Sequence, residues 1–281
     1  MQITIGTDPE VFVRDSSGTY FSVEDKNHGK LIPGTKLSPH PVECGAIQRD
    51  GVALEFNTVP AKTADEFVQY IDTVIKEMTA VYKSVRPDLE IVMTPTATFS
   101  REYFDSLPEE VKLLGCSPDY NAYTGGENEK PETDEPFRTG SGHIHVGWTR
   151  WENPHDDDHF SSCMGLVRQL DCVLYPVSLL WDSDDKRRTL YGKIGAFRPK
   201  EYGVEYRPLS NAFLSSEKIQ RYVFSVTKRA AEDFFAGIIY EDDIECYQMV
   251  EHLRSGQSID REELLEYAEN VRDKFHGVNY D

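Results

Sequence analysis

Four segments of the chain have the alternating pattern of β-strands, and each carries two polar residues, two positions apart, where a purely structural strand would carry apolar ones. The four pairs are Asp8 and Glu10, Glu55 and Asn57, His143 and His145, and Glu205 and Arg207. Residues i and i+2 of a strand point to the same face, so each pair presents both side chains to one side of a sheet. If the strands share a sheet, the sequence predicts a concave polar face lined with carboxylates, imidazoles and a guanidinium.

One such pair alone is typical of the solvent-exposed face of a half-buried strand. Four pairs in one chain favour a shared functional face instead, and the glycines beside them leave room for the close approach of a ligand or another backbone. Histidines beside carboxylates indicate a site for a divalent metal. Because carboxylate-rich ligation suits Mg²⁺ or Mn²⁺, we predict one of these cations rather than zinc.

Basic residues are concentrated in one window of an otherwise acidic chain. The window holds Arg187, Arg188, Lys193, Arg198, Lys200 and Arg207. It predicts a local anion site, and a metal faced by arginines is the combination that holds a nucleotide polyphosphate. For any single arginine, pairing with a surface acid is an equally good interpretation. The sequence has no Walker A motif.

The composition excludes some classes of protein. A net charge of −19 argues against an extended nucleic-acid surface, which needs clustered Lys and Arg. No apolar run approaches the length of a membrane span, and no cleavable leader precedes the first strand pattern, so we expect a cytoplasmic protein. The five cysteines lack CxxC spacing and indicate reduced thiols.

The remaining periodicity predicts an α+β fold. Strands are expected over residues 3–14, 52–60, 89–98 and 194–213, the last as two strands joined by a turn near 199–203. Helices are expected over 63–82, 161–181, 216–236 and 260–275, with N-caps at Thr63, Ser216 and Asp260 and a kink at Pro176. Residues 125–136 and 182–188 are expected to form loops. With neither repeat nor linker, one domain over 1–281 is predicted, with a core over 1–215 and a helical segment over 216–281.

Six stretches carry a resemblance when they are taken together. They are GTDPEVFV, DGVALEFNTVPA, GCSPDYNAY, GSGHIHVGW, KRRTLYGKIGAFRPK and GVEYRPLSN. The chain resembles the carboxylate-amine ligases of tailed phages, which are similar to the glutamate-cysteine ligase and glutamine synthetase superfamily. The resemblance covers residues 1 to about 215 and gains nothing from the C-terminal helices. It implies a curved, largely antiparallel sheet with helices packed behind, whose concave face binds ATP with Mg²⁺ or Mn²⁺.

The resemblance also implies roles for individual residues. Metal ligands are implied at Glu10, Glu55, His143 and Glu205. Contacts to ATP phosphates are implied for Arg187, Arg188, Arg198 and Arg207, and His145 lies toward phosphate or substrate. Asp8 and Asp50 are the implied acceptors of the proton that the amine loses. Arg207 is implied to contact the reacting phosphate.

The implied reaction joins a carboxylate to an amine, with ATP first converting the carboxylate to an acyl phosphate. Small-molecule and peptide substrates fit equally well, and the sequence leaves the oligomeric state open. Two other interpretations stand beside it. A metal-dependent hydrolase is one, because amidohydrolases also use HxH on a strand to bind zinc. A phage structural or accessory protein that keeps the fold without catalysis is the other.

Overall fold

Antiparallel sheets backed by helices make up the computed structural model of the chain, which describes residues 2–27, 29–112, 119–129, 134–149 and 152–276. The start of the GCSPDYNAY motif and residues 130–133 of the predicted acidic loop lie outside the described residues. The first sheet has the order β1-β13-β15-β14-β11. Its strands are β1 (Thr4–Thr7), β13 (Ile144–Gly147), β15 (Gly203–Tyr206), β14 (Ala196–Lys200) and β11 (Tyr120–Asn121). The predicted α+β class is therefore confirmed.

The second sheet has the order β3-β2-β8-β7-β6, with β9 also paired to β2. These strands are β3 (Tyr20–Phe21), β2 (Glu10–Arg14), β8 (Ala53–Thr58), β7 (Gly45–Asp50), β6 (His40–Val42) and β9 (Glu90–Val92). Two short pairs complete the strands: β4 (Glu24–Asp25) with β5 (Gly29–Lys30), and β10 (Thr96–Thr98) with β12 (Phe137–Thr139).

The chain passes from the first sheet to the second at Asp8–Pro9, where β1 ends and β2 has not begun. The strand predicted over 3–14 is therefore interrupted, because Pro9 has no N–H to donate to a ladder. On either side of the break, the Asp8 and Glu10 amides donate to the carbonyls of His143 and Ser141, at 3.4 and 2.9 Å. Asp8 consequently stands where one sheet passes into the other.

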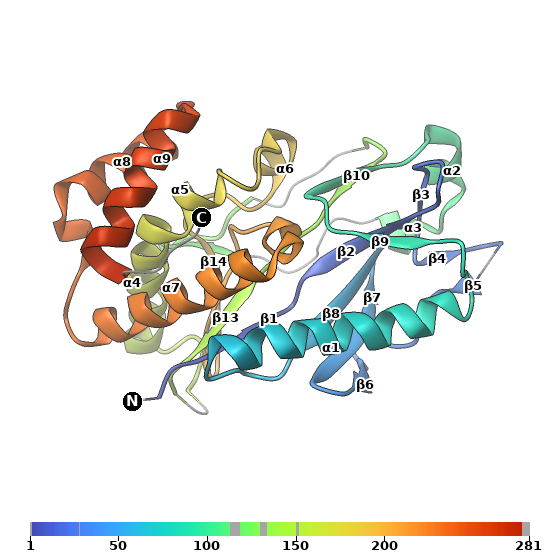
Figure 1. Cartoon of the computed structure of the whole chain (residues 1–281), viewed down its shortest axis with the longest axis horizontal. Helices are drawn as coiled ribbons and strands as arrows, with labels where there is room; N and C mark the ends of the chain where they lie inside the picture. Colours follow the sequence, from blue (N-terminus) through green and yellow to red (C-terminus); the bar gives the residue numbers. More distant parts are fainter. Residues whose placement is uncertain (1, 28, 113–118, 130–133, 150–151, 277–281) are drawn as a thin grey trace.

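The helices of the described residues are α1 (Ala64–Lys83), α2 (Arg101–Ser106), α3 (Glu109–Lys112), α4 (Asp157–Val173), α5 (Tyr175–Ser178), α6 (Asp185–Leu190), α7 (Glu217–Phe235), α8 (Ile244–Arg254) and α9 (Arg261–Val271). Three of them form a layer against the sheets: α1 contacts β7 and β8, α4 contacts β14 and β15, and α7 contacts β1 and β13 (Figure 1). Short helical turns lie at η1 (Asn211–Ser215), η2 (Tyr240–Asp242) and η3 (Arg272–His276). In Figure 1, α1 runs beneath β8, α7 lies beside it, and α8 and α9 stand at the far end.

The core forms between the sheets and this helical layer. Ile5, Val146 and Val204 alternate with the polar pairs and are fully buried on the helix side. α1 contributes Phe67, Ile71 and other apolar residues at helical spacing. The alternation that places apolar residues toward the helices is what turns the polar pairs toward the open face.

Local signals placed most helix ends correctly. Thr63 caps α1 by accepting from the Glu66 amide, and Ser216 and Asp260 cap α7 and α9 as predicted. The helix predicted over 161–181 begins earlier, at Asp157, and breaks before Pro176 into α4 and α5. The loop predicted over 182–188 is wrong in its second half, because Asp184 caps α6 there.

Two glycines beside the polar pairs accommodate backbone. A Cβ at Gly142 would lie 2.3 Å from the Ser210 carbonyl oxygen. Gly203 has a φ of +152°, and a Cβ there would lie 2.0 Å from the Val146 carbonyl oxygen. Of the two alternatives left open by the sequence, neighbouring backbone rather than a ligand explains these positions.

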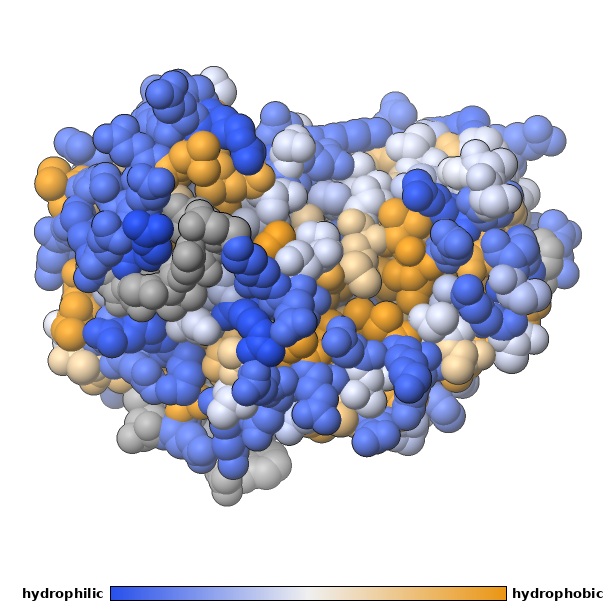
Figure 2. Space-filling view, in the orientation of Figure 1, coloured by the Kyte–Doolittle hydropathy of each residue, from blue (hydrophilic) through white to orange (hydrophobic). Residues whose placement is uncertain are grey.

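Hydrophilic residues cover most of the face seen in Figure 2, and apolar side chains gather to the right of its centre. Among the described residues, no helix combines the length and the apolar character that a membrane crossing requires.

Candidate active site

The polar pairs face one another in two rows across the sheets. In the first sheet, His145 lies opposite Glu205, and Glu205 lies opposite Arg198. In the second sheet, Glu10 lies opposite Glu55, and Glu55 opposite Gln48. Directly opposed residues are close enough for their side chains to interact. Asp8, at the junction of the sheets, connects the two rows.

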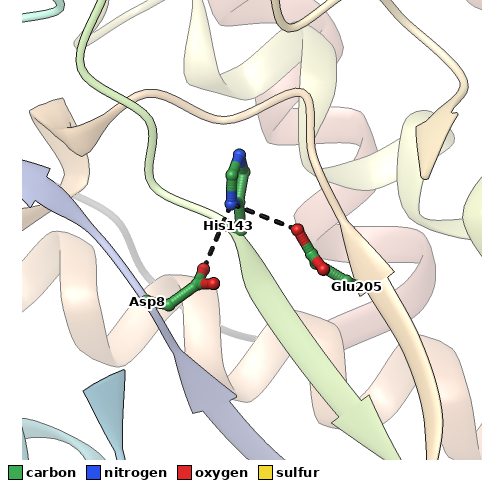
Figure 3. Close-up of side chains that lie close together, drawn as sticks. All are labelled: Asp8, His143 and Glu205. Carbon is green, nitrogen blue, oxygen red and sulfur yellow. Dashed lines mark hydrogen bonds and ion pairs between the residues drawn. The ribbon is translucent and has the colours of Figure 1, made fainter. Parts of the chain in front are cut away.

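Asp8, His143 and Glu205 form the closest group of candidate metal ligands (Figure 3). His143 Nδ1 lies 3.1 Å from Asp8 Oδ1 and 3.3 Å from Glu205 Oε1. One ligand atom from each residue falls within 4.8 Å of the others. On the other side of the ring, Nε2 lies 3.3 Å from the Tyr191 hydroxyl. A proton on Nδ1 and a divalent cation would occupy the same place between the two carboxylates.

The charges of this group depend on one another. Burial, followed by the nearby Arg207, lowers the pKa of His143 to about 4, so its imidazole is neutral at pH 7. Burial raises the pKa of Asp8, but attraction to His145 and His143 outweighs it and brings the pKa well below its usual value. A neutral imidazole beside an ionised carboxylate is the protonation state that metal ligation requires.

A second group of carboxylates lies on β2, β7 and β8. Burial, then the neighbouring Asp50, raises the pKa of Glu10 to about 8. Burial, then repulsion from Asp8, Asp50 and Glu10, raises the pKa of Glu55 well above its usual value. Asp50 forms an ion pair with Lys36 at 2.5 Å, and Oε2 of Glu55 is buried with no hydrogen-bond partner among the described residues. Ionising these carboxylates together is unfavourable because each repels the others, and a bound cation would relieve that repulsion and stabilise their ionised forms.

Basic side chains surround the far side of Glu205. Lys200 Nζ lies 2.7 Å and Arg198 Nη1 3.4 Å from Glu205 Oε2, and Arg207 pairs with Glu205 Oε1. Arg207 also lies 3.3 Å from Asp119. Burial raises the pKa of Glu205, but the histidines and Lys200 outweigh burial and lower it, so this carboxylate is ionised.

A cavity of about 340 Å³ opens among these groups. Its acidic lining residues are Asp8, Glu10, Asp50, Glu55 and Glu205. Its basic lining residues are Lys36, Arg138, Arg198, Lys200 and Arg207. His143 and Tyr191 also line it. Because the cavity is lined by several acidic and several basic side chains, it suits a ligand that combines anionic groups with metal cations.

Two of the arginines implied by the resemblance do not line this cavity. Arg187 is fully buried, and its two terminal nitrogens donate to the carbonyls of Pro208 and Leu209, both at 2.8 Å. Arg188 pairs with Asp182 and Asp185. Arg187 is used by the backbone that follows β15 and Arg188 by two aspartates, whereas strand pairing brings Arg198 and Arg207 to the cavity. The structure thus brings the other predicted site residues to this cavity, apart from His145, which contacts Asp8 at 3.0 Å from the side of an adjoining cavity.

Sequence reasoning missed several lining residues. Lys36 comes from an irregular, turn-rich segment, and Arg138 from a short strand, so neither lies in a periodic pattern that signals a role. Lys200 belonged to the basic window without an assigned role. Tyr191 and Tyr202 are bound to the two histidines, Tyr202 through His145 Nδ1. Only packing between distant segments places these residues.

A comparison with known families identifies the chain. Residues 135–278, just over half of the sequence, match the model described as phage phiEco32-like COOH.NH2 ligase-type 2. The chain belongs to this family. It is accordingly a carbon–nitrogen ligase, whose substrates are a carboxylate and an amine. Among curated proteins, none matches the chain.

The matched region carries one half of the site. It includes β13, β14 and β15 with His143, His145, Glu205 and Arg207, and it extends through α8 and α9. The ligase family therefore shares the C-terminal helices, which had contributed nothing to the resemblance seen in the sequence. The carboxylates of β2, β7 and β8 lie before the matched region.

Proposed function

We propose that the protein is an ATP-dependent carboxylate–amine ligase that forms an amide or peptide bond through an acyl phosphate. The observation that carries the proposal is the cavity itself, where five carboxylates and five Lys or Arg side chains converge in a member of a ligase family. A free carboxylate is a poor acyl donor because its leaving group would be oxide. Transfer of a phosphoryl group from ATP gives it a leaving group that departs readily.

The basic side chains of the cavity are the proposed contacts to ATP. Arg198 and Arg207 are partly or wholly engaged with Glu205, so they are held in position before a phosphate arrives. Lys36, Arg138 and Lys200 add further positive charge around the same volume. Arg187 is proposed to position Arg207 indirectly, because it donates hydrogen bonds to the carbonyls of the two residues that follow Arg207, Pro208 and Leu209.

The proposed metal ligands are His143 and Glu205, together with Glu10 and Glu55, and Asp8 lies beside His143 without being assigned to the metal. The donor set fits Mg²⁺ or Mn²⁺ because it consists of carboxylate oxygens with one imidazole. When bound, such a cation neutralises phosphate charge and orients the transferring group.

The acyl phosphate is proposed to react with an amine held beside Asp8. Asp8 is ionised and lines the cavity, whereas Asp50 is already paired with Lys36. Of the two candidate bases, Asp8 is therefore the better placed to take a proton from the incoming ammonium. The neutral nitrogen then attacks the acyl carbon, the C–N bond forms, and phosphate leaves with the electrons of the broken C–O bond. The departing phosphate takes the second proton of the nitrogen, which gives the neutral amide. His145 orients Asp8 through the 3.0 Å contact of Nε2 with Oδ1.

The fold proposed for this chemistry is the glutamine synthetase-like one, with the site on the concave side of antiparallel sheets. Its support is the junction at Asp8, which brings the two carboxylate rows together. We propose a single domain over 1–281. The reaction is placed in the cytoplasm, the host cytoplasm if the protein is phage-encoded, because ATP is supplied there.

The test is ADP release from ATP over a panel of carboxylates and amines with Mg²⁺ or Mn²⁺, followed by mass spectrometry of the product. We expect ADP release that requires both substrates, and a loss of at least about 100-fold in Glu55→Gln. Arg188→Ala is the matched control, because Arg188 lies outside the cavity, and it should keep wild-type turnover. Amide cleavage without nucleotide would favour a hydrolase. Failure of ATP and metal to bind would favour an inactive accessory protein.

A further inference from the structure

A second cavity, of about 380 Å³, adjoins the first. Asp8, Gln48 and Glu55 line both cavities and so form the wall between them. The second cavity is lined elsewhere mostly by uncharged polar groups, among them Asn57 and Thr149. A reacting centre at Asp8 is therefore reached from two sides.

The two cavities differ in charge. The first is lined by five Lys or Arg side chains, whereas among the described residues no Lys or Arg lines the second. The carboxylates in the second lining are Asp8 and Glu55. Such a wall attracts cations and repels anions, and it lacks the guanidinium or ammonium that usually pairs with a bound carboxylate. ATP phosphates consequently belong in the first cavity and a cationic substrate in the second.

A buried carboxylate oxygen of Glu55 that accepts no hydrogen bond also favours a cationic ligand in the second cavity. Glu55 is 8 % exposed, and its Oε2 accepts no hydrogen bond within the described part of the chain. A buried carboxylate oxygen without a donor is costly, and a ligand that brings N–H groups or positive charge relieves the cost. The cavity has room for a ligand larger than the smallest such ligand, ammonia. Ammonia is similar in size to water, which takes about 30 Å³ in the liquid, so the cavity has room for several more heavy atoms.

We propose that the second cavity binds the amine substrate, and that this substrate is an alkyl primary amine with no carboxylate on the carbon next to its nitrogen. The chemistry is that of a diamine or of a lysine side chain in a peptide, and not that of an α-amino group of a free amino acid. The inference rests on the proposed ligase function, and it assigns Asn57 to the specificity of the amine site. It follows from a described lining that holds no Lys or Arg and in which both ring nitrogens of His145 are already engaged, by Asp8 and by the Tyr202 hydroxyl.

The experiment separates activation of the carboxylate from choice of the amine. Hydroxylamine traps acyl phosphates as hydroxamates, so ATP-dependent hydroxamate formation over a carboxylate panel finds the acyl donor without an amine substrate. With that donor, kcat/KM is then compared for cadaverine against lysine coupled through its α-amino group, which mass spectrometry of the product identifies, and for cysteamine against cysteine. Nα-acetyl-lysine methylamide forms a further arm that distinguishes a peptide side chain from a free diamine.

We expect at least a tenfold preference for the amine without the carboxylate in each pair. A preference for the amino acid, or for ammonia, overturns the proposal while leaving the ligase function intact. If no carboxylate yields hydroxamate or ADP, the result refutes the proposed ligase function, and the inference that rests on it fails as well. Arg150 follows Thr149 and lies outside the described residues, so Arg150→Ala is included. An amino-acid preference that this variant abolishes would show a carboxylate-binding arginine, contrary to the proposal.

A charge placed in the lining tests the physical reason. Asn57→Lys introduces a cation into the second cavity and should move the cadaverine-to-lysine ratio of kcat/KM toward lysine by at least tenfold. Asn27→Lys adds the same charge at an exposed position outside the lining and should leave the ratio unchanged. Equal ratios in the Asn57→Lys variant and the wild type would show that charge in this cavity does not select the amine.

Discussion

Arg187 provides the sharpest test of how the structure assigns the basic residues. The resemblance in the sequence implies a phosphate contact, whereas the structure engages both terminal nitrogens with backbone carbonyls in a fully buried place. Arg187→Met keeps much of the side-chain volume but leaves the Pro208 and Leu209 carbonyls without their donors. The two interpretations predict different outcomes for this variant.

The expected loss follows from the two hydrogen bonds. A hydrogen bond from a charged donor contributes about 1.5–3 kcal/mol, so losing both lowers the free energy of unfolding by roughly 3 kcal/mol or more. For a domain of this size, each kcal/mol corresponds to about 2–4 °C in Tm, which gives a fall of roughly 6–12 °C. Because domains are stable by only about 5–15 kcal/mol, the variant loses a substantial part of its stability.

Thermal unfolding followed by circular dichroism measures this fall, with Arg221→Ala as the control. Arg221 forms exposed ion pairs with Asp65 and Glu217, so its removal should lower Tm far less than the Arg187→Met change does. If Arg187→Met unfolds at the wild-type temperature while its KM for ATP rises at least tenfold, Arg187 is a phosphate contact. The structural assignment would then be wrong.

Three further predictions concern the site and its support. Because burial lowers the pKa of His143 to about 4 from the ordinary 6.5, its neutral form contributes stability that is present above pH 6.5 and is lost as the pH falls toward 4; an imidazole NMR signal that titrates near 6.5 would contradict this. Burial, then Asp8, raises the pKa of Glu55, so its charge opposes folding as the pH rises above about 4.5; Glu55→Gln should raise Tm in metal-free buffer at pH 8, by a margin that disappears near pH 4.5. Buried Asn211 donates to the Glu10 carbonyl at 2.7 Å, so Asn211→Ala should lower the free energy of unfolding by about 1–3 kcal/mol in urea denaturation, and an unchanged midpoint would count against it.

The opposite charges of the first cavity come from segments with very different sequence signals. His143 and Glu205 stand in clear alternating patterns, and strand pairing carries them to one face as predicted. Lys36 lies in an irregular segment and reaches Asp50 only because the chain folds back along β7. A local pattern reports the direction of a side chain within its own element, and it carries no information about which distant element lies opposite.

The sequence by itself determined the α+β class, most helix caps and the same-face pairing of the polar residues, because alternation and capping act over a few neighbouring residues. The tertiary structure decided that Pro9 divides one predicted strand between two sheets and that Asp8 joins their carboxylate rows. It also decided that α6 turns Arg187 into the interior while β14 brings Arg198 to the cavity. These outcomes depend on packing between segments far apart in the chain, where burial and the pairing of polar groups select one arrangement among many that satisfy the local patterns.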